Sequence, residues 1–295
     1  MLSSRDFVEQ IRDDKAAVKF FQDRGVLRST WACPSCGEGS VRLKTCKGER
    51  NYRFKCSKCK CYRSLFSGSW FQCMKLTCLQ VVDMLFAWAG VSSSRTHVAN
   101  EGRVRSAEGA TDWVRYIREV CATSIADDSD EQIDGEGCIV EIDETMVTRR
   151  KYNRGRLLQQ IWVFGGVERV SGRCFFEVVA DRTETTLLEI IKRRICAGTT
   201  VISDCHRSYA NLSRHGFVHL TMNHSENFID PETGAHTQTI ESLWGALKRF
   251  LRSKGRNIGP HLEEYIAEFL YRRKHDGCIF EAIVSDIARY YPPSQ

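Results

Sequence analysis

Long apolar runs are missing from this sequence of 295 residues. No stretch of about 18 consecutive apolar residues occurs, which excludes a transmembrane helix. The first residues, MLSSRDFVEQIRDDKAAVKFF, are charged and amphipathic and lack the apolar centre of a secretory signal. Prolines are few and internal repeats are absent. We therefore expect an ordinary globular protein that stays inside the cell.

Acidic residues are scarce at the front of the chain. Residues 1–75 carry sixteen Lys/Arg against seven Asp/Glu, residues 76–138 carry five against eleven, and residues 139–295 carry twenty-two against nineteen. A basic front indicates a polyanionic partner such as DNA. A merely solvated surface is the alternative.

Cysteine, in contrast, is abundant, with fourteen residues. In an intracellular protein this number favours metal binding over a disulfide framework. Cys33 and Cys36 form one C-x2-C pair, and Cys56 and Cys59 form another after nineteen intervening residues. This spacing predicts a structural Zn²⁺ held by four thiolates in a zinc ribbon. Two neighbouring residues, Cys61 and Cys46, are alternative ligands.

The predicted ribbon is basic and aromatic. Residues 41–63 hold nine Lys/Arg and one acid, with Tyr52, Phe54 and Tyr62 interleaved. This pattern favours a nucleic-acid contact, and a ribbon that only docks on protein is the alternative. A second basic segment, RRKYNRGR at 149–156, is either a DNA-backbone grip or a solvated turn. The candidate DNA contacts are Arg42, Lys44, Arg50, Arg53, Lys55, Lys58, Lys60 and Arg63 in the ribbon, and Arg149, Arg150, Lys151 and Arg154 in the second segment.

The secondary-structure pattern changes along the chain. Apolar periodicity predicts helices first and a run of strands after residue 138, followed by alternating helices and strands, which indicates a mixed α/β sheet with helices on its faces. Helices are expected at 5–24, 76–90, 108–125, 184–196, 239–253 and 261–273, and strands at 139–147, 159–169, 173–182, 199–204 and 217–224. The expected parts are an N-terminal helix (1–28), a zinc ribbon (29–68), a helical segment with a helix-turn-helix as one option (69–126), an acidic linker (127–137), an α/β domain (138–275) and a C-terminal tail (276–295).

Three acids stand at positions where acids are uncommon. Asp143 lies inside the strand CIVEIDETMV, Asp204 ends the strand VISD, and Glu241 lies in the first turn of the helix that follows HTQT. Three carboxylates that converge over a sheet can hold two Mg²⁺ or Mn²⁺ ions. Taken singly, Asp143 has an arginine partner as its simpler explanation, Asp204 a helix cap, and Glu241 the helix dipole.

Taken in order, zinc ribbon, helical segment, EIDET, SDCHRSY and HTQTIESLWGALK resemble the Merlin-type DDE transposases, which share the ISXO2-like transposase domain with a bacterial insertion-sequence group. The resemblance covers roughly residues 30–255 and implies a ribonuclease-H-like catalytic domain with Asp143, Asp204 and Glu241 as its metal-binding acids. It also implies metal-dependent cleavage at transposon terminal inverted repeats, strand transfer by the freed 3′ hydroxyl, and at least a dimer. Localisation would be nuclear in a eukaryotic host and cytoplasmic otherwise.

Two other functions fit the same residues. One is a host-adopted zinc-ribbon DNA-binding protein that has lost transposition, and the other is a ribonuclease-H-like nuclease without strand transfer. His236, five residues before Glu241, is a candidate proton carrier or phosphate contact. Because side chains of a strand alternate, Glu141 shares a face with Asp143, as a neighbour of the site or an arginine partner, and Glu144 points to the other face.

Overall fold

The computed structural model describes residues 11–37, 41–45, 52–72, 75–90, 94–104, 106–128, 132–133, 135–147, 160–222, 236–255 and 258–294. The chain divides into two compact units. The first consists of residues 1–123 and 275–295, and the second of residues 124–274. Within the described part of the chain, no helix combines the length and apolarity needed to cross a bilayer.

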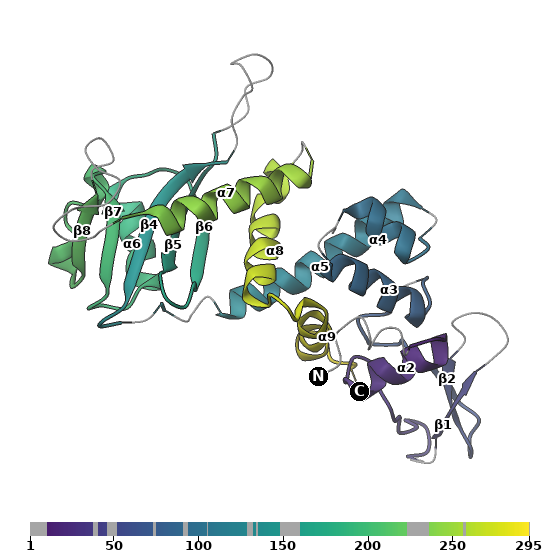
Figure 1. The fold of residues 1–295 in the computed structure, drawn as a ribbon. Helices are drawn as coiled ribbons and strands as arrows, with labels where there is room; N and C mark the ends of the chain where they lie inside the picture. The colour runs from purple at the N-terminus through teal and green to yellow at the C-terminus, as the bar shows by residue number, and fades with distance from the viewer. Residues whose placement is uncertain are drawn as a thin grey trace. The chain divides into compact units, whose positions relative to one another are not determined.

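The first unit combines helices with a small antiparallel sheet of order β1-β2-β3 (Figure 1). Side-chain caps start its helices: Asp13 caps the first one, and Thr77 with Gln80 forms a capping box on the next. The elements are α2 (Asp14–Asp23), β1 (Val41–Thr45), β2 (Tyr52–Cys56), β3 (Tyr62–Ser64), α3 (Cys78–Ala89), α4 (Arg95–Glu101), α9 (Ile279–Tyr290) and α5 (Ala107–Asp127), whose last four residues belong to the second unit.

The last helix, α9, was not expected, because residues 276–295 were interpreted as a C-terminal tail. Four apolar residues of α9, Phe280, Ile283, Val284 and Ile287, are buried. The ring of Phe280 stacks on Phe20 at 6.0 Å and meets Phe86 edge-on at 5.8 Å. The two ends of the chain therefore build one unit together.

The second unit is a five-stranded mixed sheet in the order β6-β5-β4-β7-β8. β4, β5 and β6 pair antiparallel, whereas β7 and β8 run parallel to β4. This topology confirms the expected α/β class and the ribonuclease-H-like arrangement. The elements are β4 (Ile139–Met146), β5 (Trp162–Glu168), β6 (Cys174–Val179), α6 (Glu184–Arg194), β7 (Thr200–Asp204), η3 (Arg207–Tyr209), η4 (Leu212–His215), β8 (Val218–Met222), α7 (Gln238–Ser253), η5 (Gly259–His261) and α8 (Leu262–Lys274).

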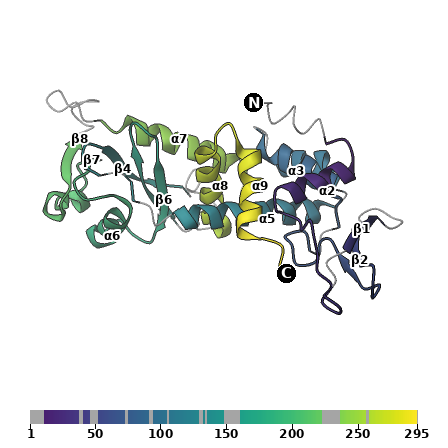
Figure 2. The ribbon, with the colours of Figure 1, turned by 90° about the horizontal axis from the view of Figure 1, so that it is seen from below.

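Helices cover both faces of this sheet, with α7 on one face and α6 on the other (Figures 1 and 2). On the α6 side, Leu187 and Ile191 pack against strand residues that include Val140 and Ile142. On the α7 side, the apolar stripe of the helix packs against Val163 and Phe176. That stripe consists of Ile240, Leu243, Trp244, Leu247 and Leu251, at the spacing of one helical face.

One residue of the expected acidic linker belongs to this fold. Ile133 is 4% exposed, packs in the α6-side core and forms a parallel β-bridge with Ile195. The segment therefore packs on the second unit at this point.

Candidate active site and metal centre

Two of the predicted acids lie on neighbouring parallel strands, Asp143 within β4 and Asp204 at the carboxyl end of β7. β4 pairs with β7 through Val140 and Val201 and through Glu141 and Ile202, and the same register carried two residues further places Asp143 level with Asp204. Burial raises the pKa of Asp143 to about 6, and the carboxylates of Glu144 and Asp204 add to the rise. Three carboxylates, those of Asp143, Glu144 and Asp204, are therefore close enough to act on one another here.

Glu144 extends the charge cluster on the other face of β4. Its side chain is 3% exposed, and its Oε1 lies 4.0 Å from Nδ1 of His206. Burial raises the pKa of Glu144, and the Asp204 carboxylate raises it further. Burial and the Glu144 carboxylate hold the pKa of the Tyr209 phenol well above its usual range. The backbone N–H of His206 donates to Asp204 Oδ1 at 2.9 Å, which fixes the loop after β7.

Glu141 joins β4 to the start of α7. It is fully buried, and its Oε1 accepts hydrogen bonds from Arg169 Nε at 2.7 Å and from Thr239 Oγ1 at 2.8 Å. Its Oε2 accepts from the backbone N–H of Ile240 at 2.9 Å. Glu141 thus satisfies one of the N–H groups that a helix start leaves without a partner inside the helix. The arginine partner expected for Glu141 is confirmed, and it is Arg169.

Glu241, the third predicted acid, lies in the turn of α7 that Glu141 holds. Its side chain is exposed and accepts a hydrogen bond from Thr237 Oγ1 at 3.2 Å. Its neighbour Ile240 bonds to β4 through Glu141, and Trp244, one turn further, bonds to Asp143. The helix start therefore lies against the strand that carries Asp143.

The three acids do not converge as tightly as a preformed metal cage would. Among the described residues, the one set of three or more possible ligands within 4.8 Å of one another is a group of cysteines. The roles of Asp143, Asp204 and Glu241 as catalytic acids stay predictions. His236 is near this site, with Nδ1 3.5 Å from Glu141 Oε1, while its carbonyl oxygen accepts from Arg169. Its part as a proton carrier also stays a prediction.

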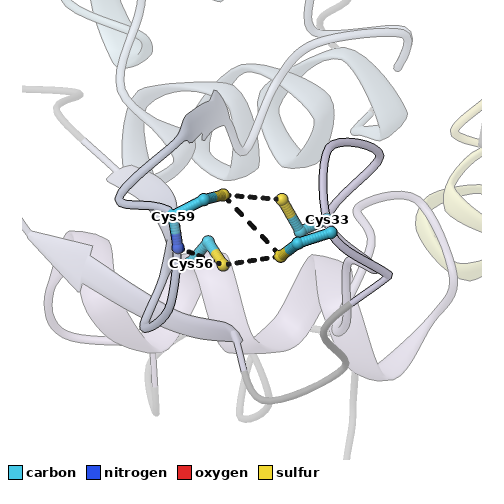
Figure 3. A group of neighbouring side chains, drawn as sticks. Cys33, Cys56 and Cys59 are labelled. Carbon is cyan, nitrogen blue, oxygen red and sulfur yellow. Dashed lines mark hydrogen bonds between the residues drawn. The ribbon is translucent and has the colours of Figure 1, made fainter.

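The cysteine group is the predicted one: Cys33, Cys36, Cys56 and Cys59. Figure 3 shows the sulfur atoms of Cys33, Cys56 and Cys59 turned toward a common centre. The Sγ atoms of Cys33 and Cys59 are 3.3 Å apart, those of Cys36 and Cys56 3.6 Å, and those of Cys36 and Cys59 3.7 Å. A tetrahedron with Zn–S bonds of about 2.3 Å has edges of roughly 3.8 Å, so the four thiols fit one Zn²⁺.

Neither of the two alternative ligands is found in this group. Cys61 lies outside it, and its Sγ is 3.5 Å from Ser35 Oγ. Cys46 lies outside the described residues. The four cysteines of the two C-x2-C pairs are therefore sufficient for the site.

One face of the β1-β2-β3 sheet is basic. Lys44 is paired with Arg53 across the β1–β2 ladder, and Lys55 is paired with Tyr62 across the β2–β3 ladder. Residues two apart on a strand share a face, so Lys44, Arg53, Lys55 and Tyr62 form one surface, the basic face. Tyr62 is 53% exposed, and Lys55 Nζ lies 5.1 Å from the centroid of its ring.

The other candidate DNA contacts differ from these. Arg63 alternates to the opposite face, and its guanidinium donates to the carbonyl oxygen of Ser294 at 3.4 Å. Lys58 and Lys60 are exposed in the turn after β2. The backbone of Arg42 pairs with Lys55, but its side chain lies outside the described part. Also outside it are Arg50, Arg149, Arg150, Lys151 and Arg154.

Several residues of the site were not singled out from the sequence. Trp244 is one of these residues: it lies in the buried stripe of α7, and its indole N–H donates to Asp143 Oδ2 at 2.9 Å. Its position three residues after Glu241 was an available signal, because such residues are neighbours on a helix. Arg169 and Tyr209 gave no local signal, since their partners are far away in the sequence.

Comparisons with known proteins bear on the second unit. A family model described as an ISXO2-like transposase domain matches residues 132–274. An uncharacterized transposase-like protein of Haemophilus influenzae is 32% identical over 95 residues, which cover 32% of this chain and 76% of the relative.

Solved structures give distant likenesses. The catalytic core of HTLV-2 integrase in complex with magnesium is 15% identical, with a TM-score of 0.30 over 46% of this chain and 86% of that chain. The catalytic core of BIV integrase is 17% identical, with a TM-score of 0.30 over 44% and 81%. A chain of a simian T-cell lymphotropic virus intasome in complex with a PP2A regulatory subunit is 18% identical, with a TM-score of 0.32 over 48% of this chain and only 49% of that chain.

Proposed function

We propose, since this chain belongs to the ISXO2-like transposase family, that it is a DNA transposase that cuts DNA strands at the terminal inverted repeats of a mobile element and joins the freed ends to target DNA. The observation that supports this most is that Asp143 within β4 lies level with Asp204 at the carboxyl end of β7, inside the region that the family matches. The cutting of DNA follows from the family, and strand transfer is the finer part of the proposal.

The carboxylate cluster fits divalent cations. Asp143 has a pKa of about 6 because it is buried beside two further carboxylates, and a cation there would offset their repulsion. We infer that Asp143, Asp204 and Glu241 hold Mg²⁺ or Mn²⁺. Bound ions of this kind stabilise both the attacking and the leaving oxygen of a phosphodiester displacement.

The remaining residues of the site have supporting roles in this proposal. Glu141 and Arg169 hold the start of α7, and with it Glu241, against β4. His206 fixes the Asp204 carboxylate through its backbone N–H. Together they keep acids from three separate elements at one end of the sheet.

The first unit supplies DNA binding in this proposal. The four cysteines would hold one Zn²⁺, and the metal would fix the sheet whose basic face carries Lys44, Arg53, Lys55 and Tyr62. Lysine and arginine contact phosphates without reading sequence, and an exposed tyrosine ring adds an apolar contact. Since transposon ends are processed in pairs, we expect at least a dimer on DNA.

The test is nicking of a DNA duplex that carries the terminal repeats of the element, with Mg²⁺ in the buffer. Asp143→Ala and Glu241→Ala should each abolish nicking. Glu189→Ala, which removes an exposed acid of α6 on the other side of the sheet, is the matched control and should nick like the parent. If either site variant nicks at the parental rate, the acid assignment is wrong.

A joining assay tests the finer part. Precut repeat ends are mixed with a target plasmid, and transposition predicts covalent joining. Nicking without joining would instead identify a nuclease, and DNA binding without nicking would identify a host-adopted binding protein.

A further inference from the structure

Trp244 connects the helix of Glu241 to the carboxylate of Asp143. Its indole Nε1 donates a hydrogen bond to Asp143 Oδ2 at 2.9 Å. The side chain is 4% exposed, and its ring stacks on Phe176 with centroids 4.4 Å apart and planes 23° apart. The donor is therefore held in place by packing and reaches a proposed catalytic acid directly.

The sheet leaves space for this ring at a glycine. Gly165 lies opposite Asp143 in the β4–β5 ladder. A Cβ atom there would lie 2.7 Å from Cη2 of Trp244 and 2.4 Å from Cδ1 of Phe176, so no side chain fits without displacing the rings. Glycine weakens the interior of a strand and often marks a close approach of another group. Here the group that approaches is the Trp244 indole.

The chemistry of the indole determines how this contact acts on the Asp143 carboxylate. An indole N–H donates and accepts nothing, so it binds one carboxylate oxygen, Oδ2, and does not itself occupy the other. The χ2 torsion of aspartate is broad, and a donor that packing holds in place restricts it.

We propose that Trp244 is a positioning residue for metal binding: its indole N–H orients the Asp143 carboxylate toward a divalent cation. The proposal rests on the proposed function, since that function makes Asp143 a metal ligand. It goes further by assigning a role to a core residue that carries no charge and binds no metal.

The experiment compares Trp244→Phe with the parent in the full chain. Phenylalanine keeps a ring on Phe176 and removes the N–H donor. The first measurement is Mn²⁺ binding by titration calorimetry without DNA. Loss of one hydrogen bond to a charged group should weaken binding by about tenfold. The second measurement is the Mg²⁺ concentration that half-saturates nicking, which should rise by a similar factor while the Kd for DNA in Ca²⁺ stays unchanged.

Two further variants separate orientation from packing. Phe176→Leu loosens the same stack but keeps the N–H donor, so it should weaken Mn²⁺ binding by less than Trp244→Phe does. Gly165→Ala keeps Trp244 but pushes its ring aside, so it should weaken Mn²⁺ binding as Trp244→Phe does. If Trp244→Phe does not fold, Gly165→Ala decides the question by the same measurement.

The outcomes distinguish this proposal from the one on which it rests. If Trp244→Phe binds Mn²⁺ with the affinity of the parent, the indole N–H has no such role. The same follows if Phe176→Leu loses as much Mn²⁺ affinity as Trp244→Phe does. Either result leaves the proposed function standing. Asp143→Asn tests the proposed function itself: if that variant still binds Mn²⁺ and nicks DNA, the metal site lies elsewhere.

Discussion

Glu141 offers the sharpest test of how this site is held together. Glu141→Gln keeps the shape of the side chain and removes its charge from the bonds to Arg169, Thr239 and the N–H of Ile240. Removing one partner of a buried ion pair costs about 3–5 kcal/mol. The lower end, about 3 kcal/mol, applies because the Arg169 side chain is 18% exposed and can still reach water.

The expected effect is local, so the assay is amide hydrogen exchange of residues 238–247 read by mass spectrometry. A loss of about 3 kcal/mol accelerates exchange by roughly 150-fold where opening is at equilibrium. The control is Asp23→Asn, which breaks the Lys19–Asp23 pair. That pair has a similar N–O distance of 2.8 Å, but its side chains are 73% and 55% exposed. The control should change stability by less than about 1 kcal/mol.

A double variant completes this test. Adding Arg169→Met to Glu141→Gln removes the arginine charge that has lost its partner, and should recover part of the protection. Unchanged exchange of residues 238–247 in the single variant would refute the reasoning, because the start of α7 would then be held by something other than Glu141.

Three further predictions concern the other groups. Because burial raises the pKa of Asp143 to about 6, the folded protein binds a proton there more readily than the unfolded chain, and its stability falls as the pH rises from about 4 to 6. Asp143→Asn removes this penalty and should raise the Tm of the metal-free protein at pH 7.5 in calorimetry; an unchanged or lower Tm counts against the burial argument. Elemental analysis should find about one zinc per chain. Cys59→Ser should lose this zinc and Cys61→Ser should keep it. The reverse result would make Cys61 the zinc ligand in place of Cys59. Arg53→Ala should reduce the slope of log K against log salt for DNA by about one, and a slope equal to that of the parent would remove the basic face from the interface.

Local sequence patterns were sufficient for most of the elements. The strand that contains Asp143 and the helix that contains Glu241 were expected within a few residues of their observed bounds, because alternation and helical stripes are local properties. The helix α9 had a readable stripe at Phe280, Ile283, Val284 and Ile287, so it was open to prediction although it was interpreted as a tail.

The contacts that build the site were beyond such patterns. The bond between Trp244 and Asp143 joins residues 101 positions apart, and the bond from Ile240 to Glu141 joins residues 99 apart. Neither hydrogen bond produces a periodic pattern in the sequence, and both depend on the sheet order that places α7 over β4. The cysteine site was predictable because its two pairs carry their own spacing.

The division of the chain has a consequence for synthesis. The second unit is an insertion between residues 123 and 275, so all of it is synthesised before α9, the helix that completes the first unit. The first unit, which carries the cysteine site, can therefore close its core only after α9 has been made. A premature stop after Lys274 would spare every proposed catalytic acid and still deprive the ribbon-bearing unit of the helix that packs on Phe20.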